Sequence, residues 1–479
     1  MNKSHVLSGI RWTLVTSVFR RMLTLVLFYF VARWLTKEDL GIFRTYCLIL
    51  GLVSTFGTLS LDFHYIIEQK KSHTGLLALW QMAAVSSGLG IILLTALSGV
   101  IGILYKSPVL GNLFLYTSVF LLSEILRKTV RAMAARRQQF RELALAETYN
   151  VALYSVLSVL ALYFIRSVWV YVVIFYLGNL LEAIYLWSKN SAAVKRTLAI
   201  LIKQRKVLSL SLYRFRAFMT QATLVSVVNL LSGNAPILLL GLMIEPVYLG
   251  VYFFASQLIG VPVGMFNTAV NQVFFPVFAG KKDGDITAMA ARYLRLVGNL
   301  GLPLLLLFTY VMMLAVAWLL GDKWSDAIPL LPAMFLLFGS SFYSNPIGGI
   351  PFIKRKPGWE LTWNVASLVI KSGAMLWGLR YSFETAIWAF AVAAAVTAIA
   401  FYLMSMHLVK LRFSSALRSV LVSFLPVLVY TPVLIVISRM SGLLSVVMAV
   451  AAGGLLLAGL NVISKGKLKA DIRMIVSGG

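Results

Sequence analysis

The sequence predicts an all-α, polytopic membrane protein with about fourteen transmembrane helices. Of its 479 residues, 60% are hydrophobic and only 12% are charged, a balance typical of chains that lie largely within a bilayer. Long apolar runs recur along the whole chain, and basic residues gather in the links between them. The net charge of +27 is therefore explained by topology, and we expect no nucleic-acid partner.

Fourteen apolar segments are long enough to cross a bilayer as helices, which takes about 20 residues at 1.5 Å each. Short polar or basic links separate them. The predicted spans are residues 12–33, 40–62, 75–103, 109–126, 143–164, 168–187, 213–242, 247–278, 294–320, 327–350, 360–379, 384–408, 419–438 and 442–463.

Lysine and arginine are distributed unevenly between the two sets of links. With the N-terminus in the cytoplasm, the cytoplasmic segments together with the adjoining ends of the spans hold 32 of the 43 Lys and Arg residues, and the opposite links with the adjoining span ends hold 7. Cytoplasmic loops of membrane proteins carry such an excess. We therefore predict that both termini are cytoplasmic. The basic cytoplasmic face also favours a bilayer that contains anionic lipids.

The spans divide into two groups of six and a terminal pair. A basic, amphipathic stretch interrupts the apolar rhythm after span six, and we expect it to lie on the cytoplasmic membrane surface. The predicted parts are an N-terminal lobe (1–187), this linker (188–212), a C-terminal lobe (213–408), and spans 13 and 14 with a basic tail (409–479).

The two lobes share a hairpin pattern. Residues 39–43, Asp-Leu-Gly-Ile-Phe, align with residues 248–252, Tyr-Leu-Gly-Val-Tyr, so that Gly41 and Gly250 stand 209 positions apart. Spans one and seven both start in the cytoplasm in the predicted topology, and the repeats therefore run parallel. We expect a pseudo-twofold axis along the membrane normal and a binding site between the lobes.

Cationic side chains lie well inside three of the predicted spans, away from the cytoplasmic ends of the helices. Arg20 and Arg21 belong to the first span, Arg44 to the second, and Lys371 to the middle of span eleven. A charge at mid-membrane costs roughly 2.5–3.5 kcal/mol on insertion scales, so such residues commonly serve a function. We interpret these four as substrate contacts in a cavity. For the arginines the sequence leaves open a second interpretation, in which they extend to the nearest interface.

Amides and acids form a second set of candidates. Four amides of spans seven and eight are candidate substrate contacts, although interhelical hydrogen bonding explains them as well. Four further residues near the cytoplasmic ends of spans are candidates for coupling or gating, although solvation explains Asp62 and His64 equally well. Nearby bases favour a structural ion pair for Glu124 and Glu182. The four amides are Gln221, Asn229, Gln257 and Asn271.

Catalytic motifs are absent from the sequence. There is no metal-ligand spacing, phosphate-binding loop or nucleophile elbow. Asp283 and Asp285 flank a glycine in a way reminiscent of a nucleotide-sugar metal motif, but Asp beside Gly in a short polar link is typical of a turn. We therefore expect a protein that is not an enzyme and holds neither cofactor nor metal.

The first hairpin resembles a known family. Residues 32–43 read Ala-Arg-Trp-Leu-Thr-Lys-Glu-Asp-Leu-Gly-Ile-Phe, similar to the hairpins of the multidrug/oligosaccharidyl-lipid/polysaccharide (MOP) exporter superfamily. In its polysaccharide-biosynthesis branch, the O-antigen (Wzx-type) flippases, the form Ala-Arg-x-Leu-(Thr/Ser)-x-x-(Asp/Glu)-x-Gly is common. The predicted layout of six, six and two spans is also that of the superfamily.

This resemblance implies a flippase that carries a polyprenyl-diphosphate-linked oligosaccharide across the bacterial cytoplasmic (inner) membrane by alternating access. The cargo would be an O-antigen, capsule or exopolysaccharide repeat unit, passed on to polysaccharide polymerase machinery. The related lipid II flippase has arginines in its first two spans, where Arg20, Arg21 and Arg44 lie. It also uses an arginine in span eight, where this chain has none, so that Lys371 or the amides take its place.

Two alternatives belong to other functional classes. One is a cation-coupled multidrug exporter of the same superfamily, although exporters of that branch usually have acidic groups deep in the cavity, where this chain has basic ones. The other is a membrane glycosyltransferase or polymerase, which usually needs a larger loop outside the membrane than any found here.

Overall fold

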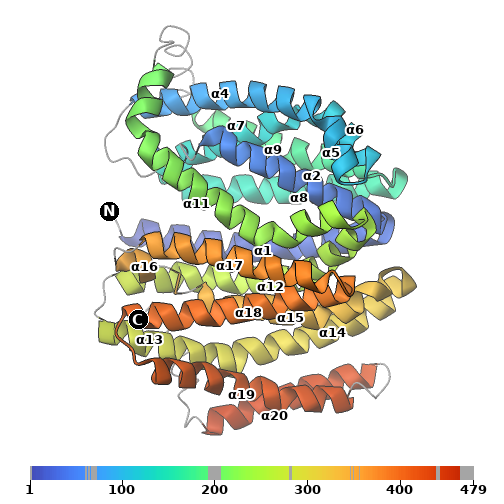
Figure 1. Cartoon of the computed structure of the whole chain (residues 1–479), viewed down its shortest axis with the longest axis vertical. Helices are drawn as coiled ribbons and strands as arrows, with labels where there is room; N and C mark the ends of the chain where they lie inside the picture. The colour runs from blue at the N-terminus through green and yellow to red at the C-terminus, as the bar shows by residue number, and fades with distance from the viewer. Residues whose placement is uncertain are drawn as a thin grey trace. The chain divides into compact units, whose positions relative to one another are not determined.

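A computed structural model describes residues 3–59, 62, 65, 73–191, 207–279, 283–345, 347–348, 350–354, 357–437 and 443–463. Every regular element within these residues is a helix (Figure 1), which confirms the predicted all-α fold. The helices are α1 (Lys3–Trp34), α2 (Lys37–Thr58), α4 (His73–Ala96), α5 (Ser98–Leu104), α6 (Pro108–Thr117), α7 (Phe120–Arg136), α8 (Phe140–Phe164), α9 (Val168–Lys189), α11 (Val207–Met243), α12 (Pro246–Ala279), α13 (Asp283–Leu296), η1 (Val297–Gly301), α14 (Leu302–Leu320), η2 (Gly321–Leu330), α15 (Leu331–Ser344), α16 (Ile350–Ile353), α17 (Pro357–Gly378), α18 (Phe383–Leu408), α19 (Phe413–Ile437) and α20 (Leu443–Ile463).

Each predicted span overlaps one or more of these helices. The span predicted at 75–103 is divided between α4 and α5, and the span at 109–126 contains a bend of 62° between α6 and α7. Within the described residues, nine helical stretches are long and apolar enough to cross a membrane, or ten when the bent pair counts as one span. The total of fourteen crossings stays a prediction.

Close contacts divide the chain into two compact units, Met1–Phe253 and Phe254–Gly479, with the boundary inside α12. In the first unit, α1 packs against α8, α8 against α9, and α9 against α7. Helix α11 packs against α2 and α4, and α2 also contacts α7. The four-part division predicted from the sequence places α11 in the C-terminal lobe, and that division stays a prediction.

The second unit is built around α18, which packs against both α15 and α17. Helices α14 and α19 form a further pair, and α20 joins them through a cluster that contains Tyr310, Tyr430 and Ala449. The Tyr430 hydroxyl donates to the Ala449 carbonyl at 2.6 Å, which fixes α19 to α20. The predicted turn at residues 283–285 is instead the first turn of α13. Acidic residues are favoured there by the helix dipole.

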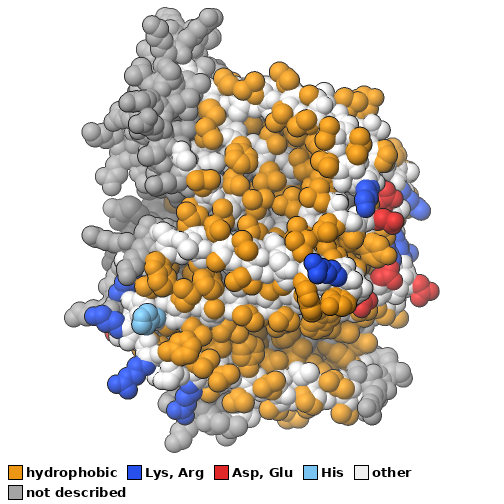
Figure 2. Space-filling view, in the orientation of Figure 1, with side chains coloured by type: hydrophobic (Ala, Val, Ile, Leu, Met, Phe, Trp, Pro, Cys, Tyr) orange, Lys and Arg blue, Asp and Glu red, His pale blue; other side chains and the backbone are white. Residues whose placement is uncertain are grey.

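The described surface is strongly apolar. On the face shown in Figure 2, hydrophobic side chains cover most of the described area, and charged side chains gather mainly toward its margins. Large exposed hydrophobic residues include Ile92, Phe164, Trp318 and Leu455. Continuous apolar surface of this extent is unfavourable in water, and it fits a chain that lies in lipid.

Candidate anion-binding site

The short link between α1 and α2 is fixed by a capping box. The Thr36 hydroxyl accepts a hydrogen bond from the Asp39 N–H at 3.0 Å, and the Asp39 carboxylate accepts one from the Thr36 N–H at 3.1 Å. Leu35 and Leu40, on either side of this cap, are fully buried, in the positions of a hydrophobic staple. The Leu-Thr-x-x-Asp part of the hairpin pattern is thus a helix start, and it sets the register of α2.

Arg44 lies two turns into α2 and is half-buried. Its Nη2 donates to Asn234 Oδ1 on α11 at 2.7 Å. Its guanidinium carbon stands 5.4 Å from the centre of the Phe253 ring, near the start of α12. The Nε atom is buried and has no hydrogen-bond partner. Within the described part of the chain, no carboxylate pairs with Arg44.

This environment leaves the charge of Arg44 uncompensated. An amide oxygen and an aromatic face both attract a guanidinium, but neither carries a formal negative charge. A buried donor without a partner is costly and is commonly satisfied by a ligand. Phosphate oxygens match the planar fork of arginine, and the bonds they accept from it are strong because both partners are charged. Arg44 is therefore suited to bind an anion.

Arg20, on α1, has a different environment. Its Nη2 forms an ion pair with Glu147 Oε2 of α8 at 2.8 Å, and its Nη1 donates to the Ala144 carbonyl at 3.3 Å. Ser17, one turn earlier, accepts a further bond at 2.9 Å. The guanidinium is thus fixed to α8 by a full counter-charge. Its charge is not available to a ligand unless Glu147 releases it.

Glu147 belongs to a longer chain of alternating charges that joins four helices. Arg131 pairs with both Glu147 and Glu182, the latter at 2.7 Å. Glu182 lies 3.7 Å from Arg127, and Arg127 pairs with Glu124 at 2.8 Å. The six residues, which we call the charge chain, comprise three arginines and three glutamates, and their formal charges cancel. They are Glu124, Arg127, Glu182, Arg131, Glu147 and Arg20.

Amides complete the charge chain. Asn150 Nδ2 donates to Glu182 at 2.7 Å, and Asn179 Nδ2 donates to Glu124 at 3.2 Å. Glu182 is almost fully buried. A buried carboxylate that lost these partners would be strongly destabilising. The contacts of Glu124 and Glu182 are those of structural ion pairs, the interpretation favoured by their sequence neighbours, whereas a coupling role for them stays a prediction.

The other predicted site residues differ in exposure within the described structure. Arg21 is half-buried on α1 and Asp62 is half-buried beyond the end of α2. Asn229 is exposed on α11, while Gln257 on α12 and Lys371 on α17 are half-buried in their helices. His64 and the side chains of Gln221 and Asn271 lie outside the described residues. Their assignments as substrate or gate residues stay predictions.

Sequence reasoning did not assign the partners of two predicted arginines, which are Glu147 for Arg20 and Asn234 for Arg44. Glu147 lies one turn inside a predicted span, and Asn150 follows it on the same face at a spacing of three. An acid at that depth is unusual, and it was the available signal for an intramembrane counter-charge. Asn234 was recognisable as one of several amides in span seven. Nothing in its spacing indicated which arginine it would contact.

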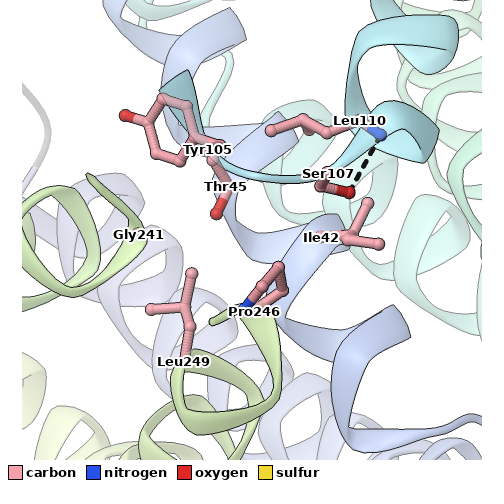
Figure 3. A pocket seen from close by; sticks show the side chains of 8 residues that line it. All are labelled: Ile42, Thr45, Tyr105, Ser107, Leu110, Gly241, Pro246 and Leu249. Atoms are coloured by element: carbon pink, nitrogen blue, oxygen red, sulfur yellow. Dashed lines mark hydrogen bonds between the residues drawn. The ribbon is translucent and has the colours of Figure 1, made fainter. Parts of the chain in front are cut away.

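A small pocket lies beside α2, lined by residues of α2, the turn between α5 and α6, α6 itself, α11 and α12 (Figure 3). It contains about 190 Å³ of empty space, part of which is open to solvent. The Ser107 hydroxyl there accepts the Leu110 N–H at 3.3 Å, as the cap of α6. The pocket is too small for an oligosaccharide. Its lining residues are Ile42, Thr45, Tyr105, Ser107, Leu110, Gly241, Pro246 and Leu249.

Sequence comparison finds relatives in polysaccharide synthesis. Residues 30–329 match the family described as polysaccharide biosynthesis protein. The lipopolysaccharide biosynthesis protein WzxC of Escherichia coli (strain K12) is 25% identical over 76% of this chain and 73% of its own length. The teichuronic acid biosynthesis protein TuaB of Bacillus subtilis (strain 168) is 22% identical over 88% of this chain and 86% of its own length.

Solved structures of similar fold are transporters. The lipid II flippase MurJ, in an inward closed conformation, matches 96% of this chain and 99% of its own with a TM-score of 0.65 and 16% identity. A multidrug resistance MATE family transporter of the MOP superfamily, in an inward-facing conformation, matches 85% of this chain and 99% of its own with a TM-score of 0.61 and 12% identity. The chain belongs to the polysaccharide biosynthesis protein family and has the fold of a MOP-superfamily transporter.

Proposed function

We propose that this protein is a flippase, which moves a polyprenyl-diphosphate-linked oligosaccharide across the inner membrane by alternating access. The family and the relatives in lipopolysaccharide and teichuronic acid synthesis support a surface-polysaccharide repeat unit as the cargo. The fold shared with a lipid II flippase supports the transport of a lipid-linked sugar. A transporter of this kind needs no catalytic group.

The environment of Arg44 is the observation that best supports this proposal. A pyrophosphate is the chemical group common to polyprenyl-diphosphate-linked cargoes, and it carries at least two negative charges. Arg44 supplies a permanent positive charge and an unsatisfied buried N–H, with no carboxylate pairing to it among the described residues. Because arginine stays charged at any physiological pH, this contact does not depend on protonation.

The remaining predicted contacts complete the proposal. Arg21 would meet the pyrophosphate from the first half of the chain and Lys371 from the second half, and Arg20 would join them only when Glu147 releases it. The amides Gln221, Asn229, Gln257 and Asn271 would contact the sugar, and Asp62, His64, Glu124 and Glu182 would act in gating or coupling. The proposed arrangement has both termini in the cytoplasm, a surface rich in anionic lipid and a polymerase that receives the cargo.

Translocation in vitro tests the function. The purified protein is reconstituted into liposomes with a fluorescent polyprenyl-diphosphate-linked oligosaccharide, and a membrane-impermeant reagent reports the amount in the outer leaflet. We expect the accessible fraction to change faster than in protein-free liposomes, and Arg44→Ala to remove most of the difference. Equal rates with and without protein, together with uptake of cationic drugs, would favour the multidrug exporter.

Cysteine labelling tests the orientation. In a Cys47→Ser background, Arg141→Cys is expected to react only with reagents that reach the cytoplasm, and Ser325→Cys with impermeant reagents added outside. Both positions are exposed in the structure. The reverse pattern would invert the proposed topology.

A further inference from the structure

The repeated Leu-Gly pattern contacts itself. Gly41 of α2 lies against the backbone carbonyl of Pro246, and Gly250 of α12 lies against the backbone carbonyl of Lys37. Gly250 stands 209 positions after Gly41, and Pro246 stands 209 positions after Lys37, so both pairs occupy equivalent positions in the repeat. The two contacts are therefore the same contact made twice, in opposite directions. The first turns of α2 and α12 meet as if around a local twofold axis.

Neither glycine has room for a side chain. A Cβ on Gly41 would overlap the Pro246 carbonyl oxygen, and a Cβ on Gly250 would overlap the Lys37 carbonyl oxygen. Both obstacles are backbone atoms, which a rotamer change does not remove. By contrast, a Cβ on Gly51, further along α2, would meet nothing within 4 Å. Glycine is unfavourable within a helix, so its presence at these two positions fits the close approach of the backbones.

The next turn of each helix carries the anion site. Arg44 follows Gly41 by three residues, and Phe253 follows Gly250 by three, so these residues are also related by the shift of 209. The guanidinium of Arg44 lies over the Phe253 ring. Asn234 of α11 holds the other side of the guanidinium through its Oδ1. Two consecutive turns of α2 and α12 thus have different roles. One turn of each helix forms the glycine contact, and the next turn forms the environment of Arg44.

We propose that the Gly41–Gly250 contact is a gate and that its closure positions Arg44 for the anion through Asn234 and Phe253. The predicted topology places this end of α2 at the outer face of the membrane. Opening the gate separates α2 from the start of α12, removes Phe253 from the guanidinium, and releases the bound anion outward. This inference rests on the proposed function and extends it to the coupling between gate and site.

The contact has the properties of a reversible gate. It consists of backbone atoms of the first helical turns, and no ion pair joins α2 to α12 among the described residues. Such a contact separates without breaking an ion pair. It closes in one register only, because the two helices approach this closely only where each places a glycine against the other backbone.

Bulky residues at the two glycines test the gate. Gly41→Val and Gly250→Val are compared with Gly51→Val. Each variant also carries Cys47→Ser, which removes the native thiol, and Thr45→Cys, which places a thiol at a buried position beside the gate. We expect the first two variants to reach normal membrane levels, to lose at least tenfold in transport, and to raise labelling of position 45 by an impermeant thiol reagent added outside. Gly51→Val should behave as the parent.

The labelling assay does not depend on the identity of the cargo, so the gate is testable even where the proposed function fails. Normal transport in Gly41→Val would overturn the gate, as would a loss of transport without increased labelling. Where valine prevents accumulation, Gly41→Ala and Gly250→Ala replace it, since alanine already overlaps the opposing carbonyl. For the alanine variants too, normal transport, or a loss of transport without increased labelling, would overturn the gate.

Binding of polyprenyl diphosphate tests the positioning of Arg44. We expect Asn234→Ala to weaken the affinity of the purified protein for this probe by roughly tenfold, the scale of one hydrogen bond to a charged group. The rate at saturating substrate and the thermal stability should stay near those of the parent. Gly233→Ala is the control, because a Cβ there would meet nothing within 4 Å. An unchanged affinity in Asn234→Ala would refute the positioning role.

Discussion

Arg20 and Arg44 are both arginines inside predicted spans, yet the structure gives them opposite environments. Arg20 ends a chain of six alternating charges whose sum is zero. Arg44 contacts an amide and a phenyl ring, and its Nε has no partner. The depth of a charge within a span therefore does not tell whether it is structural or ligand-binding. The formal charge of the neighbouring residues indicates which of the two roles it has.

The difference has a physical consequence for each region. In the charge chain, every charge has a partner, so adding an anion displaces an existing carboxylate and gains little. At Arg44, an anion would replace only water or empty space and would satisfy a buried donor. We therefore expect substitutions at Arg44 to change transport more than stability. Substitutions in the charge chain should change stability more than transport.

The largest effect is expected at Arg44. Arg44→Ala should lower transport about 10- to 150-fold, because a hydrogen bond between charged groups contributes about 1.5–3 kcal/mol and each 1.4 kcal/mol is tenfold. The membrane level should hold, since removing a charge from a span lowers its insertion cost. Arg44→Lys should retain part of the activity, because lysine keeps the charge but loses the planar fork. Complementation of surface polysaccharide, normalised to membrane protein level, measures both.

A comparison with Arg20 sharpens this prediction. Arg20→Ala should reduce transport less than Arg44→Ala at equal membrane level. Equal losses for the two variants would mean that Arg20 leaves Glu147 to bind the cargo, and the distinction between the two regions would then fail.

The next effect is on stability within the charge chain. Glu147→Ala leaves Arg20 and Arg131 short of a counter-charge. The expected cost is about 1–3 kcal/mol, below the value for a fully buried pair because the two side chains keep 13% and 27% exposure. A double-mutant cycle with Arg20→Ala should give a coupling energy of about 0.5–3 kcal/mol. Thermal denaturation in detergent measures each variant. A coupling energy near zero would show that the pair does not contribute.

Local features of this molecule were predictable from the sequence. The hairpin pattern specifies a capping box at Thr36 and Asp39, because both partners lie within one turn of each other. The depth of Arg44 follows from the length of its span. The repeat at Gly41 and Gly250 was visible as an alignment of five residues.

Contacts between distant segments were not predictable in the same way. Asn234 is 190 residues from Arg44, and Glu147 pairs with arginines of two other helices. Helical periodicity specifies which residues share a face, but it does not specify which faces meet. The reciprocal approach of Gly41 and Gly250 also required the packed structure, since an alignment shows similarity and not contact.

The smallest effect is expected at the start of α2. Thr36→Ala removes the hydroxyl that caps the helix and should cost about 1 kcal/mol of stability. Thr36→Ser keeps the hydroxyl and should behave as the parent. Ser419→Ala is the control, because its hydroxyl is exposed and bonds only within its own helix turn, so its effect should stay within about 0.5 kcal/mol. Thermal denaturation and complementation are measured together. Because Gly41 and Asn234 also hold α2 and Arg44 in place, transport by Thr36→Ala should fall less than twofold. A tenfold loss would mean that the cap, rather than the contacts with α11 and α12, determines the position of Arg44.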